Sequence, residues 1–200
     1  RMLDAVSDMA ARFQTRDPLK GTLRLGLNES FALTCLPDLL RRLEQRYPGV
    51  KTSVFVGDTG TVSGLLNRQE LDIAIVSEPA VDAHVTQESI GRNRLGWFAS
   101  ADFAIRREVL SPLDLCPFHL VVSPPTARLY TTVTRWFAEA GALPQRVSMC
   151  NSLSVTMLTI LQGAAIGIVP VRVMKDELER GRVKRLPVVP EIPAHHVSLC

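Results

Sequence analysis

The sequence contains no apolar run long enough to form a membrane helix. Its longest apolar stretches, such as residues 164–171, fall far short of the roughly 20 residues that a bilayer requires. Asp4 and Asp8 lie where a secretory signal would have its apolar core. We therefore expect a cytoplasmic location and no membrane partner.

Paired metal ligands are also missing. The four cysteines are widely spaced, with no CxxC pair, and the four histidines are scattered. We expect reduced thiols that are buried as small hydrophobic groups, and neither a metal site nor a cofactor. A redox switch is the alternative, but it would need two cysteines that meet.

The charge pattern does not indicate DNA binding, and no catalytic motif indicates an enzyme. The 23 basic and 20 acidic side chains leave a net charge of +3, with no block of like charges. The sequence has no GxSxG elbow, HExxH pair, P-loop or GxGxxG turn. Carboxylates near the expected strand ends, such as Glu29 and Asp58, are typical of caps and turns. We expect that the chain is not an enzyme.

What the sequence does contain is a change of periodicity along the chain. The apolar residues from Met2 to Phe13 recur at spacings of four, three and four, which is a heptad pattern. This pattern predicts that residues 1–16 form the end of a coiled-coil-like linker helix. Pro18 and Gly21 then interrupt the helix.

From residue 22 on, short apolar strands alternate with amphipathic helices, which predicts an α/β fold with parallel sheets in two lobes. The first lobe is expected to have strands at residues 22–27, 50–56 and 71–76 and helices at residues 31–47 and 62–67. The second is expected to have strands at residues 118–123, 146–150 and 165–169 and helices at residues 127–140 and 154–162. A helix at residues 171–180 and strands near residues 183–188 and 196–199 complete the prediction.

Several motifs occur in a fixed order along the chain. They are Gly21-Thr22-Leu23-Arg24-Leu25-Gly26, Arg46-Tyr47-Pro48-Gly49-Val50, Glu70-Leu71-Asp72-Ile73-Ala74-Ile75 and Gly167-Ile168-Val169-Pro170. Each motif alone is weak, whereas the ordered set is specific. The set resembles the C-terminal effector-binding (regulatory) domain of LysR-type transcriptional regulators, over residues 21–200.

The resemblance implies a type-2 periplasmic-binding-protein-like fold, in which two Rossmann-like lobes are joined by two crossover strands. It implies that lobe I comprises residues 21–100 and 171–200, and lobe II residues 101–170. A small-molecule effector is expected in the interlobe cleft, where its binding alters the lobe angle and the subunit arrangement. Promoter DNA is expected to be bound only through an N-terminal winged helix-turn-helix, which this sequence does not include.

The resemblance also implies a homodimer or homotetramer. Its antiparallel contacts are expected between the helix at residues 31–47 and a second-lobe helix such as residues 127–140. The leucine stripe of the first of these helices, Leu36 to Leu43, is interpreted as core, or in part as a subunit contact.

In the first lobe, the candidate effector residues follow strand ends, where ligands of such sheets bind. Ser30 is expected to cap the helix that follows the first strand and to offer its hydroxyl, although it could be a plain N-cap. The resemblance places polar effector contacts at Ser30 and Thr59. Asn28, Phe31 and Ser77 are further candidates.

In the second lobe, Thr126, Arg128, Asn151 and Ser152 also follow strand ends, and the resemblance implies that they face the first set across the cleft. Arg128 could pair with a carboxylate through two hydrogen bonds, or it could be an ordinary exposed helix arginine. We expect an organic anion, such as an aromatic acid, as the effector.

Two other functions stay open. One is a free solute-binding protein of a transport system, because that fold is shared, although the heptad helix and the missing signal argue against it. The other is an enzyme on a related α/β fold, which the missing motifs argue against.

Overall fold

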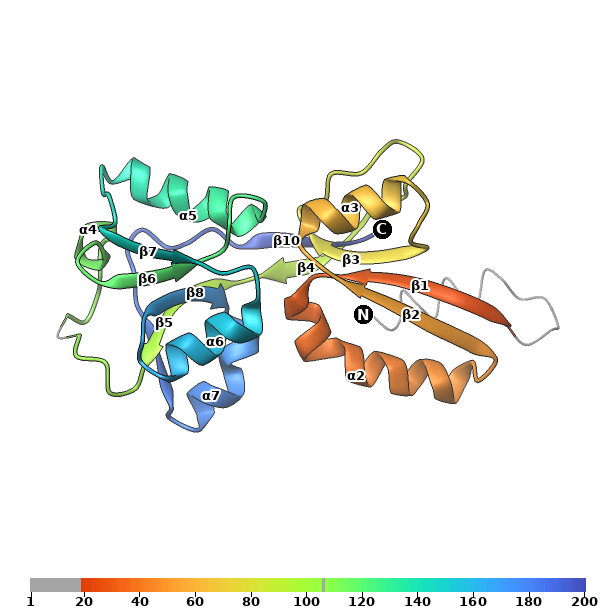
Figure 1. Cartoon of the computed structure of the whole chain (residues 1–200), viewed down its shortest axis with the longest axis horizontal. Helices are drawn as coiled ribbons and strands as arrows, with labels where there is room; N and C mark the ends of the chain where they lie inside the picture. Colours follow the sequence, from red (N-terminus) through yellow and green to blue (C-terminus); the bar gives the residue numbers. More distant parts are fainter. Residues whose placement is uncertain (1–18, 106) are drawn as a thin grey trace. The chain divides into compact units, whose positions relative to one another are not determined.

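Two five-stranded sheets organise the chain in this computed structural model, which describes residues 19–105 and 107–200 (Figure 1). The elements in chain order are β1 (Gly21–Leu27), α2 (Glu29–Arg46), β2 (Val50–Val56), α3 (Thr59–Asn67), β3 (Ile73–Ser77), β4 (Glu88–Asn93), β5 (Leu95–Ser100), α4 (Pro112–Leu115), β6 (His119–Val122), α5 (Arg128–Glu139), β7 (Arg146–Met149), α6 (Leu153–Leu161), β8 (Ile166–Pro170), the 3-10 helix η1 (Val171–Met174), α7 (Lys175–Glu179), β9 (Val183–Leu186) and β10 (His195–Leu199). The predicted α/β class is confirmed.

The first sheet has the strand order β2-β1-β3-β10-β4. Strands β1, β2 and β3 are parallel, and β10 runs antiparallel to β3. Parallel neighbours need crossover connections, which α2 and α3 provide on opposite faces of the sheet (Figure 1). The carboxyl ends of β1, β2 and β3 therefore lie at one edge, where α2 and α3 begin.

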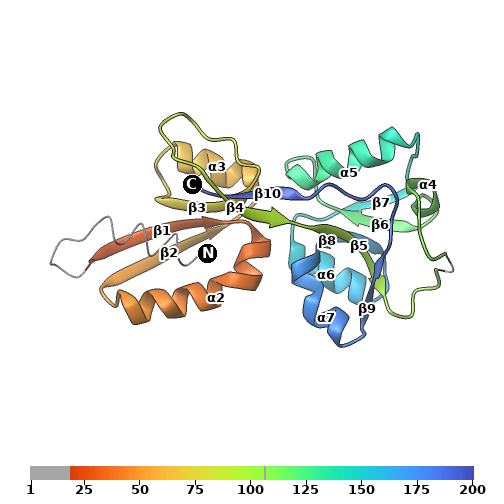
Figure 2. The same ribbon diagram turned by 180° about the vertical axis from the view of Figure 1, so that it is seen from behind.

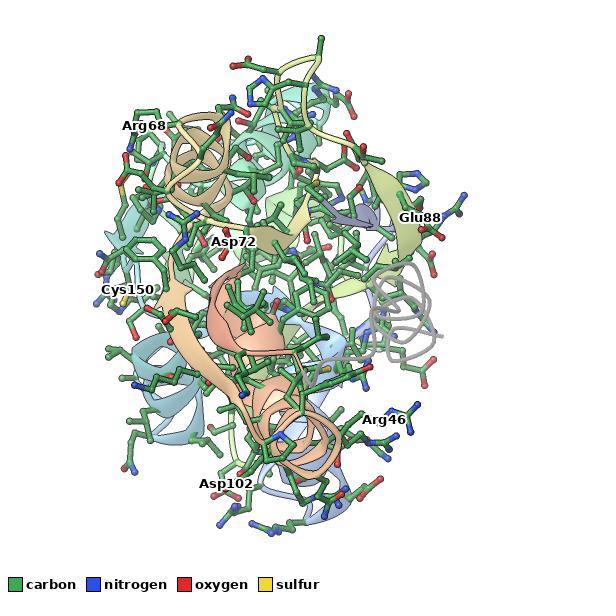
Figure 3. The ribbon with its side chains drawn as sticks, turned by 90° about the vertical axis from the view of Figure 1, so that its right-hand side faces the viewer. Arg46, Arg68, Asp72, Glu88, Asp102 and Cys150 are labelled. Atoms are coloured by element: carbon green, nitrogen blue, oxygen red, sulfur yellow. The ribbon has the colours of Figure 1, made fainter. Side chains whose placement is uncertain are left out.

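The alternation of side chains along the strands supplies a core on each face of this sheet. On the α2 face, Leu39 and Leu43 pack against Leu25, which confirms the core interpretation of the leucine stripe for these two helix residues. On the α3 face, Val62 packs against Ala74 of the neighbouring strand. The outer side of α2 is charged, and Figure 3 shows Arg46 extending away from the ribbon.

The second sheet repeats this plan in the order β7-β6-β8-β5-β9. Strands β6, β7 and β8 are parallel, and β5 is antiparallel to β8. On one face Trp97 packs against Trp136 and Phe137 of α5, with ring centroids 6.0 Å and 5.9 Å apart. On the other face Phe98 shares a core with Ile160 of α6.

The chain divides into one unit of residues 19–91 and 196–200 and a second unit of residues 92–195. This division differs from the predicted one, which assigned residues 92–100 and 171–195 to the first lobe. The physical reason is strand pairing, because β5 lies between β8 and β9 in the second sheet. The chain passes between the units within β4 and within β10, which are neighbours in the first sheet (Figure 2).

Local differences from the sequence prediction are few. The helix predicted at residues 171–180 is the 3-10 helix η1 followed by α7, and β4, β5 and α4 were not predicted. The four cysteines are free thiols and half-buried rather than fully buried, and burial raises the pKa of the Cys200 thiol. The linker helix predicted for residues 1–16 lies outside the described residues. Within those residues, no helix has both the length and the apolar character needed to cross a membrane.

Candidate functional site

The side chain of Asn28 connects the ends of three parallel strands. It follows β1, and its Oδ1 accepts a hydrogen bond from the Ser77 N–H at 2.8 Å, at the end of β3. Its Nδ2 donates to the carbonyl oxygen of Gly57 at 3.2 Å, directly after β2. Asn28 occupies the N-cap position of α2, but its side chain makes no cap hydrogen bond to the helix. The structure therefore brings Asn28 and Ser77 together.

Thr59 belongs to the same network, but its hydroxyl proton is already used. The Thr59 hydroxyl donates to the Ser77 carbonyl oxygen at 2.9 Å and lies 3.4 Å from Asn28 Nδ2, which can donate to it. A hydroxyl has a single proton. The Thr59 hydroxyl can therefore accept a further hydrogen bond from a ligand, but it cannot donate one without losing the bond to Ser77.

The prediction that Ser30 caps a helix is wrong. Helix α2 begins at Glu29, so that Ser30 lies in its first turn instead of before it. Ser30 is half-buried, and its N–H and hydroxyl have no hydrogen-bond partner among residues 19–105 and 107–200. Both groups are therefore available to a ligand. Phe31, by contrast, packs against the core that contains Leu27 and Ile75.

The start of α3 supplies further donors at the same edge of the sheet. Asp58 caps this helix by accepting a hydrogen bond from the Thr61 N–H at 2.9 Å. The N–H groups of Thr59 and Gly60 have no partner in the described part of the chain. Sequence reasoning missed Gly60, although a glycine in the first turn of a helix after a strand was the signal that could have identified it.

These donors suit an anion. Helix α2 has 18 residues and α3 has 9, and the positive ends of both helix dipoles lie at the carboxyl edge of β1 and β2. Unpaired N–H groups at such an edge bind carboxylate or phosphate oxygens. The Asn28 network holds this edge together below the donors.

The second unit brings its four candidates to the matching edge of its own sheet. Strands β6 and β7 are parallel, and the Cys150 N–H donates to the Val122 carbonyl oxygen at 2.9 Å. The candidates therefore follow neighbouring strand ends. They are Thr126, Arg128, Asn151 and Ser152.

Only Ser152 among these has a clear local role. It caps α6 by accepting a hydrogen bond from the Val155 N–H at 3.4 Å. Thr126, Arg128 and Asn151 are exposed, and Arg128 makes no ion pair within the described residues. That the two sets of candidates face one another stays a prediction.

The two-unit fold is that of the regulatory domains of LysR-type regulators. The chain is similar to the regulatory domain of CcmR of Synechocystis PCC6803 in complex with 2-PG, with a TM-score of 0.79 and 20% identity over 90% of this chain and 86% of that one. It is similar to the effector-binding domain of QuiR in complex with shikimate, with a TM-score of 0.72 and 17% identity over 90% of this chain and 87% of that one.

The sequence itself places the chain in a family. It belongs to the LysR substrate binding domain family, whose model matches residues 16–200. It is 27% identical over 191 residues to the HTH-type transcriptional regulator CbbR of Rhodospirillum rubrum, covering 94% of this chain and 62% of that relative. The chain therefore spans less than two thirds of the relative's length.

Proposed function

We propose that this chain is the effector-binding domain of a LysR-type transcriptional regulator and that its effector is a small organic anion. The observation that supports an anionic ligand is the group of unpaired donors at the start of α2 and α3, namely Ser30 and the amide of Gly60. Family membership and similar folds solved with 2-PG or shikimate support a small-molecule ligand. The family is one of regulators rather than of enzymes.

The residues of the first unit divide into two roles. Ser30, through its hydroxyl and N–H, and Gly60, through its N–H, donate to the anion. Asn28 and Thr59 position these donors, because their own side chains hold the strand ends together. In the second unit, the exposed guanidinium of Arg128 is the group best suited to a carboxylate.

Control of transcription belongs, in this proposal, to a longer cytoplasmic regulator that binds promoter DNA through a winged helix-turn-helix. Effector binding changes the subunit arrangement only to the extent that the ligand prefers one arrangement over the other. We further propose a homodimer or homotetramer. Sedimentation of the chain at high concentration tests this, and a monomer throughout would contradict it.

The ligand class is tested by a thermal-shift screen of organic acids, since a ligand selective for the folded chain raises its melting temperature. Calorimetry of the best acid then compares Ser30→Ala with Ser53→Ala, a matched loss of one hydroxyl from exposed β2. We expect Ser30→Ala to weaken binding by about tenfold, the loss of one hydrogen bond to an anion.

The Ser53→Ala control shows whether a loss of affinity in Ser30→Ala is specific to the site. Ser53→Ala should bind as tightly as the unaltered chain, and both variants should melt at its temperature in the absence of ligand. Equal affinities for the two variants would remove Ser30 from the site.

A further inference from the structure

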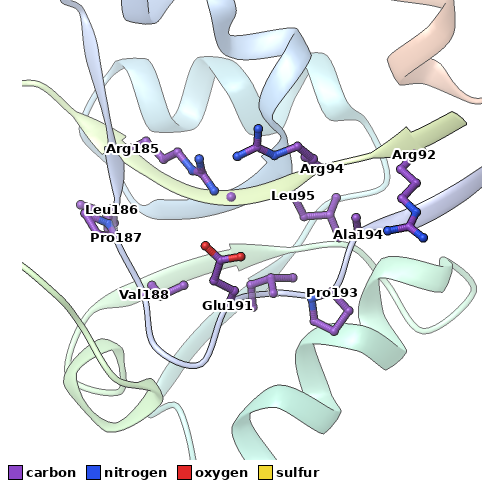
Figure 4. Close-up of a pocket in the computed structure, with 12 residues that line it drawn as sticks. Arg92, Arg94, Leu95, Arg185, Leu186, Pro187, Val188, Glu191, Pro193 and Ala194 are labelled. Carbon is purple, nitrogen blue, oxygen red and sulfur yellow. The ribbon is translucent and has the colours of Figure 1, made fainter.

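The second unit contains a pocket of about 640 Å³ that includes none of the residues discussed above (Figure 4). Its lining comes from the end of β4, from β5 and β9, and from residues 187–194. All of these residues lie within residues 92–195, so the pocket belongs to one unit. The pocket is therefore separate from the donors of the first unit.

The charged side chains around this pocket are unbalanced. Arg92, Arg94 and Arg185 line it together with a single carboxylate, Glu191. Figure 4 shows Arg185 and Glu191 extending toward each other from opposite walls. None of the four makes an ion pair or a side-chain hydrogen bond with any residue that the structure describes, although Arg182, close by in sequence, pairs with a glutamate. The lining therefore carries two positive charges in excess.

One buried residue of the lining, Gly96, is closely fitted to an arginine. Leu95, Gly96 and Leu186 are buried, whereas the arginines are exposed at the rim. Arg185 projects from the same face of the sheet as Phe98, and Leu186 from the face of Trp97. A Cβ atom at Gly96 would lie 3.0 Å from Nε of Arg185. The missing side chain at Gly96 therefore leaves room for the Arg185 guanidinium to lie across β5.

The wall formed by residues 187–194 is held by hydrogen bonds at three places. The backbone of Leu110 exchanges hydrogen bonds of 2.9 Å with Pro187 and Val189. The indole Nε1 of Trp136 donates to the carbonyl oxygen of Pro190 at 2.8 Å. The Thr132 hydroxyl and His195 Nε2 form a hydrogen bond of 2.7 Å. A wall fixed in this way loses little conformational freedom when a ligand binds.

We propose that this pocket binds a small organic dianion. Arg94 and Arg185 hold its two anionic groups. The excess of two positive charges matches a dianion, and an anion among the guanidinium groups relieves their mutual repulsion. The Glu191 carboxylate repels an anionic ligand and reduces the positive charge of the lining to the excess of two. The site is distinct from the proposed effector site and does not depend on it.

The test is a nuclear magnetic resonance titration of the ¹⁵N-labelled chain with phthalate, an aromatic dianion. The amide signals of Leu95, Gly96, Ile192 and Ala194 should shift and give a dissociation constant for the pocket itself. Benzamide, which has a similar ring but no charge, should leave these signals unchanged. The amide signal of Ser30 reports separately on the first unit.

Three variants distinguish a binding site from a chance contact. Arg185→Gln should raise the dissociation constant by at least about fivefold, and Glu191→Gln should lower it, because the two changes move the local charge in opposite directions. Arg135→Gln removes an exposed arginine of α5 outside the pocket and should leave the constant unchanged. All four side chains of the pocket rim are exposed, so these variants should fold.

The proposal would be overturned by unshifted pocket signals at millimolar phthalate. It would be overturned equally by the same constant for Arg185→Gln and Arg135→Gln, or by weaker binding to Glu191→Gln. If the pocket signals shift with phthalate and the Ser30 signal does not, the result counts against phthalate binding at the proposed effector site and supports the pocket.

Discussion

At the scale of single residues, the side chain of Asn28 holds the strand ends of the candidate site together. One amide side chain satisfies the Ser77 N–H at the end of β3 and the Gly57 carbonyl oxygen directly after β2. Ser77 is buried, so its backbone groups have little access to water. Asn28 thus stabilises the edge at which Ser30 and Gly60 lie.

We expect Asn28→Ala to lower the free energy of unfolding by about 1–3 kcal/mol, because it leaves a buried donor without a partner. Urea denaturation measures this loss. Asn151→Ala removes an exposed amide and serves as the control, with an expected change of less than about 0.5 kcal/mol. Equal losses in the two variants would contradict the role assigned to Asn28.

The pair formed by Arg24 and Asp72 predicts a dependence of stability on pH. The Arg24 guanidinium donates hydrogen bonds of 2.6 Å and 3.2 Å to Asp72 and holds the pKa of that carboxyl below its ordinary value. A lowered pKa in the folded state stabilises the fold above the ordinary pKa of about 3.9, and this stabilisation disappears as the pH falls through the folded-state pKa.

The difference in unfolding free energy between the unaltered chain and Asp72→Asn should therefore be present at a pH of about 6 and shrink toward a pH of about 3. Urea titrations at the two values measure it. A difference that does not change with pH would show that the carboxylate charge is not the cause.

At the scale of elements, close packing of α6 against the second sheet depends on Gly167. A Cβ atom there would lie 2.6 Å from Cδ1 of Ile160 and 2.9 Å from Cγ1 of Val121, both of which are buried. Gly167→Ala should lower the free energy of unfolding by about 1–3 kcal/mol, since a packed core resists added volume.

Gly64, inside α3, offers the opposite case. A Cβ atom at Gly64 meets only the Arg68 guanidinium at 3.4 Å. Gly64→Ala should therefore stabilise the chain by about 0.5–1 kcal/mol through its helix propensity. Urea denaturation of the two variants tests the pair, and a change of the same sign in both would contradict this account of the packing.

Much of the element order could be predicted from hydrophobic periodicity, because α2 and α5 each bury one apolar stripe. The strand β5 could not be predicted in this way. All but its last residue are buried, so it shows no alternation, and the residues that cover it lie far away in sequence.

The candidate site was predictable in part for the same reason. Strand ends place Asn28, Thr59 and Ser77 at one edge, as expected. Which hydroxyl is free and which is engaged could not be predicted, because the Thr59 bond to Ser77 joins residues 18 positions apart. The start of α2 at Glu29 likewise depends on Asn28 turning toward the strands.

At the scale of the whole molecule, two units with the same strand arrangement each present helix N-termini at the carboxyl edge of a parallel sheet. Such an edge binds a ligand without any catalytic group. This agrees with membership of the LysR substrate binding domain family.

The most direct test of the central claim is a crystal structure of the chain with the organic acid selected by the thermal-shift screen. The account predicts an anionic oxygen within about 2.5–3.2 Å of the Ser30 hydroxyl and of an N–H at the start of α2 or α3. An acid bound with no contact to Ser30, Thr59 or Gly60 would contradict it.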